Sequence, residues 1–153
     1  MDCKAQVSLE FLLIFFISLI ILSVISIPLT YDTINTVNDI KSSTEVKNTL
    51  VELSNNVNIV YSSGYGSKKT ISVNVPSKMN IYYKSVNKKH YLYSYVILSD
   101  NTKKEVSTQV PCKVSFNGKS SYYYTSLKKG WYYNTEIKWI YSSDEYCMNI
   151  NFK

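Results

Sequence analysis

The hydrophobic positions divide the chain into three stretches with different patterns, and the first is almost wholly apolar. Phenylalanine, leucine, isoleucine and valine fill residues 11–27 apart from three serines, and no charged side chain occurs in residues 11–31. At 1.5 Å per residue, a helix over residues 11–29 is about 28 Å long, close to the hydrocarbon thickness of a bilayer. The pattern predicts a hydrophobic helix over residues 6–29 that spans a membrane or packs in an apolar assembly.

The second stretch, residues 30–63, has apolar side chains with the period of a helix. Intervals of four, three, four and three residues place one set of these side chains on a single face. This stripe consists of Val46, Leu50, Leu53, Val57 and Val60. Gly64 lies in the Ser- and Gly-rich run that follows, and it is the expected C-cap. We expect an amphipathic helix whose stripe covers a globular head. A juxtamembrane coiled-coil stalk is the alternative.

Pro28 lies at the end of the apolar segment, where the two helical stretches meet. Inside a continuous helix, the proline ring removes one backbone hydrogen bond and predicts a kink. At the first position of a second helix, proline is well tolerated. Both alternatives allow a bend at Pro28 between the hydrophobic segment and the residues that follow.

From residue 68 to residue 153 the period changes to two, which is typical of β-strands. Apolar side chains alternate with polar ones in short runs separated by turns, as in an antiparallel β-sandwich or curled sheet. The runs cover residues 71–75, 79–83, 91–98, 106–110, 114–116, 131–141 and 148–152. The predicted fold class is therefore α+β, with a long N-terminal helix followed by a β-rich head of seven or eight strands.

The composition offers little that supports catalysis. The chain has one histidine, His90, three cysteines and four glycines. No CxxC, HExxH, Walker A or GxGxxG pattern occurs, so neither a zinc site nor a phosphate-binding loop is indicated. His90 lies beside Lys88 and Lys89, which disfavours a Ser/His/Asp triad. We predict that the protein is not an enzyme and has no catalytic residue, metal site or cofactor.

The formal net charge is +6, and paired lysines fall at predicted turns or strand ends. Lysines at such positions keep strand edges from aggregating. The alternative is a basic surface for acidic polymers, nucleic acid or an anionic cell surface. The chain has fifteen tyrosines, and we interpret those in alternating strands as core-filling residues and cross-strand pairs. No specific nucleic-acid partner is therefore predicted.

Glu10 directly precedes the apolar segment, and an ionised carboxylate at a membrane core costs about 2.5–3.5 kcal/mol. It belongs to the run Gln6-x-Ser8-x-Glu10, after which Ile14 follows three further residues. This run resembles the class III signal peptide of archaeal type IV pilin-like proteins. That family's pattern is Gln-x-Ser-x-Glu, then three residues and an aliphatic residue that is usually leucine.

The resemblance implies how the chain is matured and what it does. A prepilin peptidase would cut between Ala5 and Gln6, removing residues 1–5 as a leader and keeping the whole hydrophobic helix. The single-pass membrane precursor would then become a structural subunit of an archaeal surface filament. Its partners would be other pilin subunits, in a homo- or hetero-oligomeric filament. The head is large compared with the smallest archaeal pilins, which agrees with a minor or accessory pilin.

Two other classes of protein fit the same sequence. The chain can be an uncleaved single-pass surface protein with a β-rich binding head. It can also be a secreted basic binding domain that is cleaved near Ser26, although the N-terminus lacks the positive region of a secretory signal. The first residue of the mature chain separates the three: Gln6 for the pilin, Met1 for the anchored protein and Ile27 for the secreted domain.

Cys3 would leave with the leader, so two cysteines would remain in an exported chain. A bridge between Cys112 and Cys147 would close a loop of about 36 residues and stabilise the head by roughly 4 kcal/mol. However, Cys112 shares the parity of its apolar neighbours Val110 and Val114, whereas Cys147 opposes that of Met148. The sequence therefore leaves open a disulfide or two separate thiols.

Overall fold

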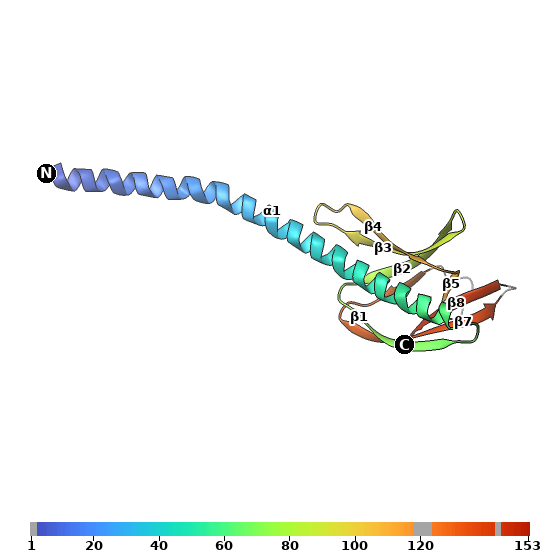
Figure 1. Ribbon diagram of the computed structural model, residues 1–153. Helices are drawn as coiled ribbons and strands as arrows, with labels where there is room; N and C mark the ends of the chain where they lie inside the picture. The colour runs from blue at the N-terminus through green and yellow to red at the C-terminus, as the bar shows by residue number, and fades with distance from the viewer. Residues whose placement is uncertain (1–2, 118–123, 143–144) are drawn as a thin grey trace. The chain divides into compact units, whose positions relative to one another are not determined.

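The computed structural model describes residues 3–117, 124–142 and 145–153, and the side chains of residues 9–117, 124–141 and 146–153. In these residues one long helix precedes eight strands, which confirms the α+β fold class (Figure 1). The elements are α1 (Cys3–Ser62), β1 (Lys68–Val75), β2 (Met79–Val86), β3 (Lys89–Ile97), β4 (Lys103–Val110), β5 (Val114–Phe116), β6 (Tyr124–Leu127), β7 (Trp131–Ser142) and β8 (Glu145–Phe152).

The chain divides into two compact units, residues 1–38 and residues 39–153. In the first unit, α1 runs through Pro28 without interruption, so this proline does not open a second helix. The bend expected at Pro28 stays a prediction. In the second unit, the remainder of α1 lies with the strands. Figure 1 shows β2, β3 and β4 on one side of this helical segment and β1, β7 and β8 on the other.

The strands form two four-stranded sheets, with the orders β1-β7-β8-β5 and β4-β3-β2-β6. Strand pairing is antiparallel, as predicted, except that β5 pairs with β8 in parallel, with Val114 opposite Met148. The connection from β4 to β5 contains Pro111, which cannot donate a ladder hydrogen bond. After this proline the chain leaves the sheet that contains β4. It joins the other sheet as its edge strand β5, which runs parallel to β8.

Strand β6 is the element that the hydrophobic pattern did not reveal. It has four residues, and only Thr125 and Leu127 are buried. One buried threonine and one buried leucine are too short a pattern for sequence analysis to recognise. Pairing with β2, where Met79 lies opposite Leu127, holds this segment in the sheet.

The hydrophobic core lies where the second half of α1 meets both sheets. All five stripe residues of the helix are buried, with no more than 3% of each side chain exposed, as the helical spacing predicted. From the sheets, Val73, Ile81, Leu92 and Ile137 are fully buried in the same cluster. From Asp39 onward, α1 therefore belongs to the same compact unit as the strands, and its stripe forms part of their core.

Specific hydrogen bonds fix this helix against the strands and end it. The Asp39 carboxylate accepts hydrogen bonds from both the backbone N–H and the hydroxyl of Ser99, each at 2.9 Å. The Ser54 hydroxyl donates to the carbonyl of Gln109 at 2.6 Å. Gly64 has a φ of +90°, a left-handed conformation that glycine adopts without strain, as expected of a C-cap.

Turn residues account for the hairpin between β2 and β3 and for the placement of the lysines. Asn87 and Lys88 have φ values of 50° and 61°, and Val86 lies opposite Lys89. This is the two-residue turn that suits the twist of a hairpin. The lysine pairs lie at strand starts or turns, as predicted. An Asn-Gly pair is a strong sequence signal for a turn. In the pair Asn117-Gly118, Asn117 has a φ of +52°, and Gly118 lies outside the described residues.

Candidate processing and assembly site

The part of α1 that lies in the first unit exposes apolar side chains on all of its faces. By length and composition this helix can cross a membrane, and no residue of its most apolar window is buried. The largest exposed fractions include Phe11 75%, Ile27 69%, Leu29 68%, Leu9 68% and Val24 67%. Because so much apolar area is costly in water, the segment needs lipid or other apolar helices around it.

The hydroxyl groups within this segment are satisfied by the helix itself. Ser18 donates to the carbonyl of Phe15 at 2.7 Å, and Ser23 donates to that of Leu19 at 2.8 Å. Thr30 donates to the Ser26 carbonyl at 2.8 Å. A hydroxyl bonded to its own backbone carries little penalty in an apolar medium. These polar residues therefore do not oppose burial in lipid or in a bundle of helices.

The residues of the signal motif lie at the start of this helix. The backbone is helical at Ala5, Gln6 and Ser8, whose side chains lie outside the described residues. The rest of the predicted leader, Met1 and Asp2, also lies outside them. Glu10 is exposed, and no residue in the described part of the chain pairs with its carboxylate. Ile14 is 63% exposed and lies four residues further on, so it shares a helix face with Glu10.

Comparison with known proteins bears directly on this helix. Residues 4–29 match the family model described as class III signal peptide. The chain carries the type IV pilin-like signal. No curated protein and no solved structure matches the chain.

This signal supports a type IV pilin-like precursor, and it accounts for the exposed helix. Precursors with this signal are anchored in the membrane by the apolar helix and destined for the cell surface. They are processed by a peptidase and assemble with other pilin subunits, which is a structural rather than an enzymatic role. The match covers the signal and the apolar segment, and the head lies outside it.

In the β-rich head, the backbone segments of the two candidate disulfide cysteines lie side by side, and both cysteines are free thiols. The Met148 amide donates to the Lys113 carbonyl at 2.8 Å, which brings the residue after Cys112 beside the residue after Cys147. Cys147 lies 3.8 Å from the Ser115 hydroxyl, whereas Cys112 packs against the core. The opposite parities inferred from the sequence are thus preserved, and the disulfide stays a prediction.

Burial, with a smaller contribution from the nearby Cys147, raises the pKa of the Cys112 thiol to about 11. Only the thiolate attacks alkylating reagents. In the reduced, folded chain at pH 8, we expect iodoacetamide to modify Cys112 about 100-fold more slowly than an ordinary thiol. Mass spectrometry of tryptic peptides measures this rate, with the urea-unfolded chain as control. Equal rates in the folded and unfolded chains would contradict the prediction.

The single histidine, His90, contacts a tyrosine on the neighbouring strand. His90 Nδ1 lies 2.6 Å from the Tyr83 hydroxyl, and the two rings stack with centroids 5.9 Å apart. Among the described residues, no group of three or more His, Cys, Asp or Glu side chains could hold a metal ion. The histidine therefore joins β2 and β3 through a hydrogen bond between two side chains.

Most of the described tyrosines are exposed or only partly buried. Among the described tyrosines, only Tyr83 is buried, so core filling is wrong for most of them. Cross-strand pairing is confirmed, since Tyr82 lies opposite both Tyr93 and Tyr124. The parity of Tyr93 and Tyr95 against the buried Leu92 already pointed to the outer face. Which tyrosine on a neighbouring strand lies opposite each of them became known only from the strand register.

Proposed function

We propose that the protein is a type IV pilin-like subunit of an archaeal surface filament, of the minor or accessory kind. A prepilin peptidase removes residues 1–5, and the mature chain assembles through its N-terminal helix. The head remains outside the cell and needs no catalytic residue or cofactor. The observation that carries this proposal is the class III signal at residues 4–29 on a helix with no buried residue in its most apolar window.

The two units support a division of roles. Residues 39–153 contain the buried core, whereas residues 9–37 expose large apolar side chains such as Phe16 and Ile20. A head that has its own core can stay folded while the apolar helix changes surroundings. Extraction from the membrane and packing against neighbouring helices exchange one apolar environment for another.

Cleavage also changes the charge at the start of the helix. A cut after Ala5 creates an α-amino group on Gln6, with a pKa near 7.7–8.0 in model compounds, so it is largely positive at neutral pH. In the filament, Glu10 of one subunit pairs with this amine on a neighbour. The pair neutralises a carboxylate that would otherwise be buried alone among apolar side chains. Since the amine does not exist before cleavage, the ion pair can form only after the leader has been removed. Assembly therefore depends on processing.

The N-terminal residue of the mature protein tests the proposal. The full chain is produced in membranes with and without an archaeal prepilin peptidase, and its N-terminus is determined by mass spectrometry. We expect Gln6 as the first residue when the peptidase is present. Ala5→Phe should remain uncut because a bulky residue replaces the small one before the cut, whereas Ala5→Gly should be cut normally.

Two other N-termini would overturn the proposal. Retention of Met1 in the presence of an active peptidase indicates an uncleaved single-pass surface protein with a binding head. A chain that begins at Ile27 indicates a secreted domain.

A further inference from the structure

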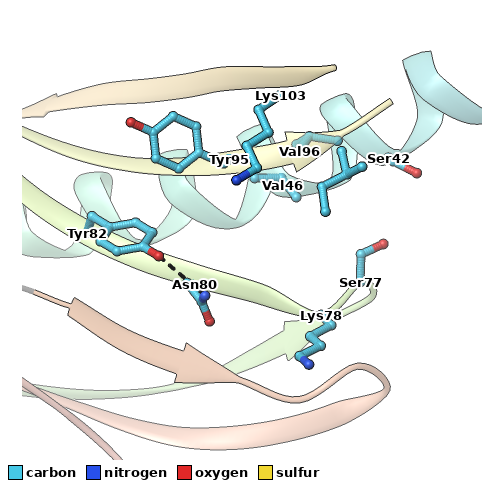
Figure 2. Close-up of a pocket in the computed structure, with 10 residues that line it drawn as sticks. Ser42, Val46, Ser77, Lys78, Asn80, Tyr82, Tyr95, Val96 and Lys103 are labelled. Carbon is cyan, nitrogen blue, oxygen red and sulfur yellow. Dashed lines mark hydrogen bonds between the residues drawn. The ribbon is translucent and has the colours of Figure 1, made fainter. Parts of the chain in front are cut away.

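A cleft opens in the β4-β3-β2-β6 sheet where β2 and β3 separate. These strands pair from Tyr82 opposite Tyr93 as far as Val86 opposite Lys89. Before Tyr82, β2 pairs with β6, and after Tyr93, β3 pairs with β4. The space between them is a cavity of 470 Å³, and Ser42 and Val46 of α1 contribute to its lining (Figure 2). This volume is typical of small-ligand sites.

The charged groups that line the cleft are positive. Lys78 and Lys103 line it from opposite sides, and Figure 2 shows the Lys103 side chain crossing β3 toward the gap. In the described part of the chain, neither lysine has an ion-pair partner. The nearby carboxylate of Glu45 accepts a hydrogen bond from the Ser77 hydroxyl at 3.1 Å. The cleft therefore has an excess of positive charge that attracts an anion.

Polar groups without charge complete the lining. The Asn80 side-chain amide donates to the Tyr82 hydroxyl at 3.3 Å, which orients both groups on the β2 wall (Figure 2). Tyr95 lines the β3 wall. A phenol both donates and accepts hydrogen bonds, and so does an amide. The cleft thus offers contacts suited to a ligand with several hydroxyl groups.

A row of tyrosines continues from the cleft across the outer face of this sheet. Tyr82 stacks on Tyr93 with ring centroids 5.2 Å apart, and the Tyr82 and Tyr124 centroids are 5.6 Å apart. Tyr95 contacts both Tyr82 and Tyr93. Tyr95 and Tyr124 remain 45% and 52% exposed. Open aromatic faces carry partial negative charge and attract the slightly positive C–H bonds of a sugar ring.

The acidic group beside this row is already neutralised. Glu105 of β4 forms an ion pair with Lys84. The Lys84 Nζ also lies 4.6 Å from the centre of the Tyr93 ring. This pairing leaves the charges of Lys78 and Lys103 available to a ligand.

We propose that the cleft between β2 and β3, together with the tyrosine row, binds an anionic saccharide. Lys103 and Lys78 contact a sugar carboxylate, Asn80 and the Tyr82 hydroxyl contact sugar hydroxyls, and the exposed tyrosines pack on the apolar faces of neighbouring sugar rings. Single-stranded nucleic acid fits less well because its binding sites follow several phosphates along an extended basic groove. This site goes beyond the role in filament assembly and does not depend on leader cleavage.

Isothermal titration of the full-length chain in detergent with trigalacturonate tests the proposal. We expect saturable binding with a dissociation constant of about 1 mM or lower. The methyl ester of the same trisaccharide should bind at least tenfold more weakly, because it retains the sugar rings and loses the carboxylates. Lys103→Gln should weaken trigalacturonate binding about tenfold through loss of a hydrogen bond to a charged group.

Matched variants separate this cleft from general attraction to a basic protein. Lys104→Gln removes the same charge from the neighbouring position, which does not line the cleft, and should bind as wild type does. Tyr95→Ala should weaken binding at least threefold, whereas Tyr132→Ala, which changes an exposed tyrosine on the other sheet, should not.

Three results would overturn the proposal. The first is no binding of trigalacturonate at 10 mM, a concentration about ten times the expected constant. The second is equal weakening by Lys103→Gln and Lys104→Gln. The third is tighter binding of a short single-stranded DNA than of trigalacturonate, which would assign the cleft to another class of ligand.

Discussion

Replacing Glu10 with glutamine should reduce the number of surface filaments at least tenfold. Glutamine keeps the shape of the side chain and removes its charge. In the proposed filament, the α-amino group of Gln6 would then lie in an apolar bundle without a carboxylate. Removal of one partner from a buried ion pair costs about 3–5 kcal/mol, which corresponds to more than a hundredfold change in an equilibrium constant. Electron microscopy of cells that produce the variant counts the filaments.

The design of this experiment separates assembly from processing. The mature N-terminus of the Glu10→Gln variant should still be Gln6, which shows that the leader is removed. Glu52→Gln is the matched control, because Glu52 is an exposed acid in the second half of the same helix. It should leave the filament count unchanged. If Glu10→Gln cells assembled as many filaments as wild type, the pairing of Glu10 with the amine would be wrong.

Replacing Leu53 with alanine should lower the free energy of unfolding of the head by about 3 kcal/mol. Leu53 lies in the middle of the helical stripe, and its side chain is fully buried between the two sheets. The change removes apolar contacts and leaves a cavity that the surrounding strands fill only partly. We expect the melting temperature to fall by roughly 10–15 °C, as followed by near-ultraviolet circular dichroism of the full-length chain in detergent.

Ile59→Ala provides the matched control for this change. Ile59 is on the same helix, but its side chain is 49% exposed, so less contact area is lost. Its effect should be below about 1 kcal/mol. Equal destabilisation by the two changes would show that the stripe does not carry the packing of the helix on the sheets.

Hydrophobic period explains why most of the fold was predictable from the sequence. The spacing of Val46, Leu50 and Val57 specifies one helix face, and in the structure that face is buried. Alternation in β3 separated the buried Leu92 and Val96 from their outward neighbours. Strand β6 was not predicted, because a four-residue strand with two buried positions gives no periodic signal. The parallel pairing of β5 was not predicted either, because periodicity carries no information about which strand becomes the neighbour.

The two candidate sites also differ in how far they could be predicted from the sequence. The signal motif at Gln6, Ser8 and Glu10 is local, so its residues are recognised by their spacing alone. The cleft requires Lys78 and Lys103, which are far apart in the sequence and line one cavity only because β2 and β3 separate. The alternation in the strands predicts core-filling tyrosines and cross-strand tyrosine pairs, and the register identifies Tyr93 as the partner of Tyr82.

The sequence by itself therefore determined the apolar helix, its signal and the stripe that packs on the head, because each depends on residues within a few turns of one another. Tertiary structure decided which sheet each strand joins, that β5 runs parallel to β8, and where the tyrosines and unpaired lysines meet. These features depend on pairing between distant segments, and a strand pattern is compatible with many partners until the chain folds.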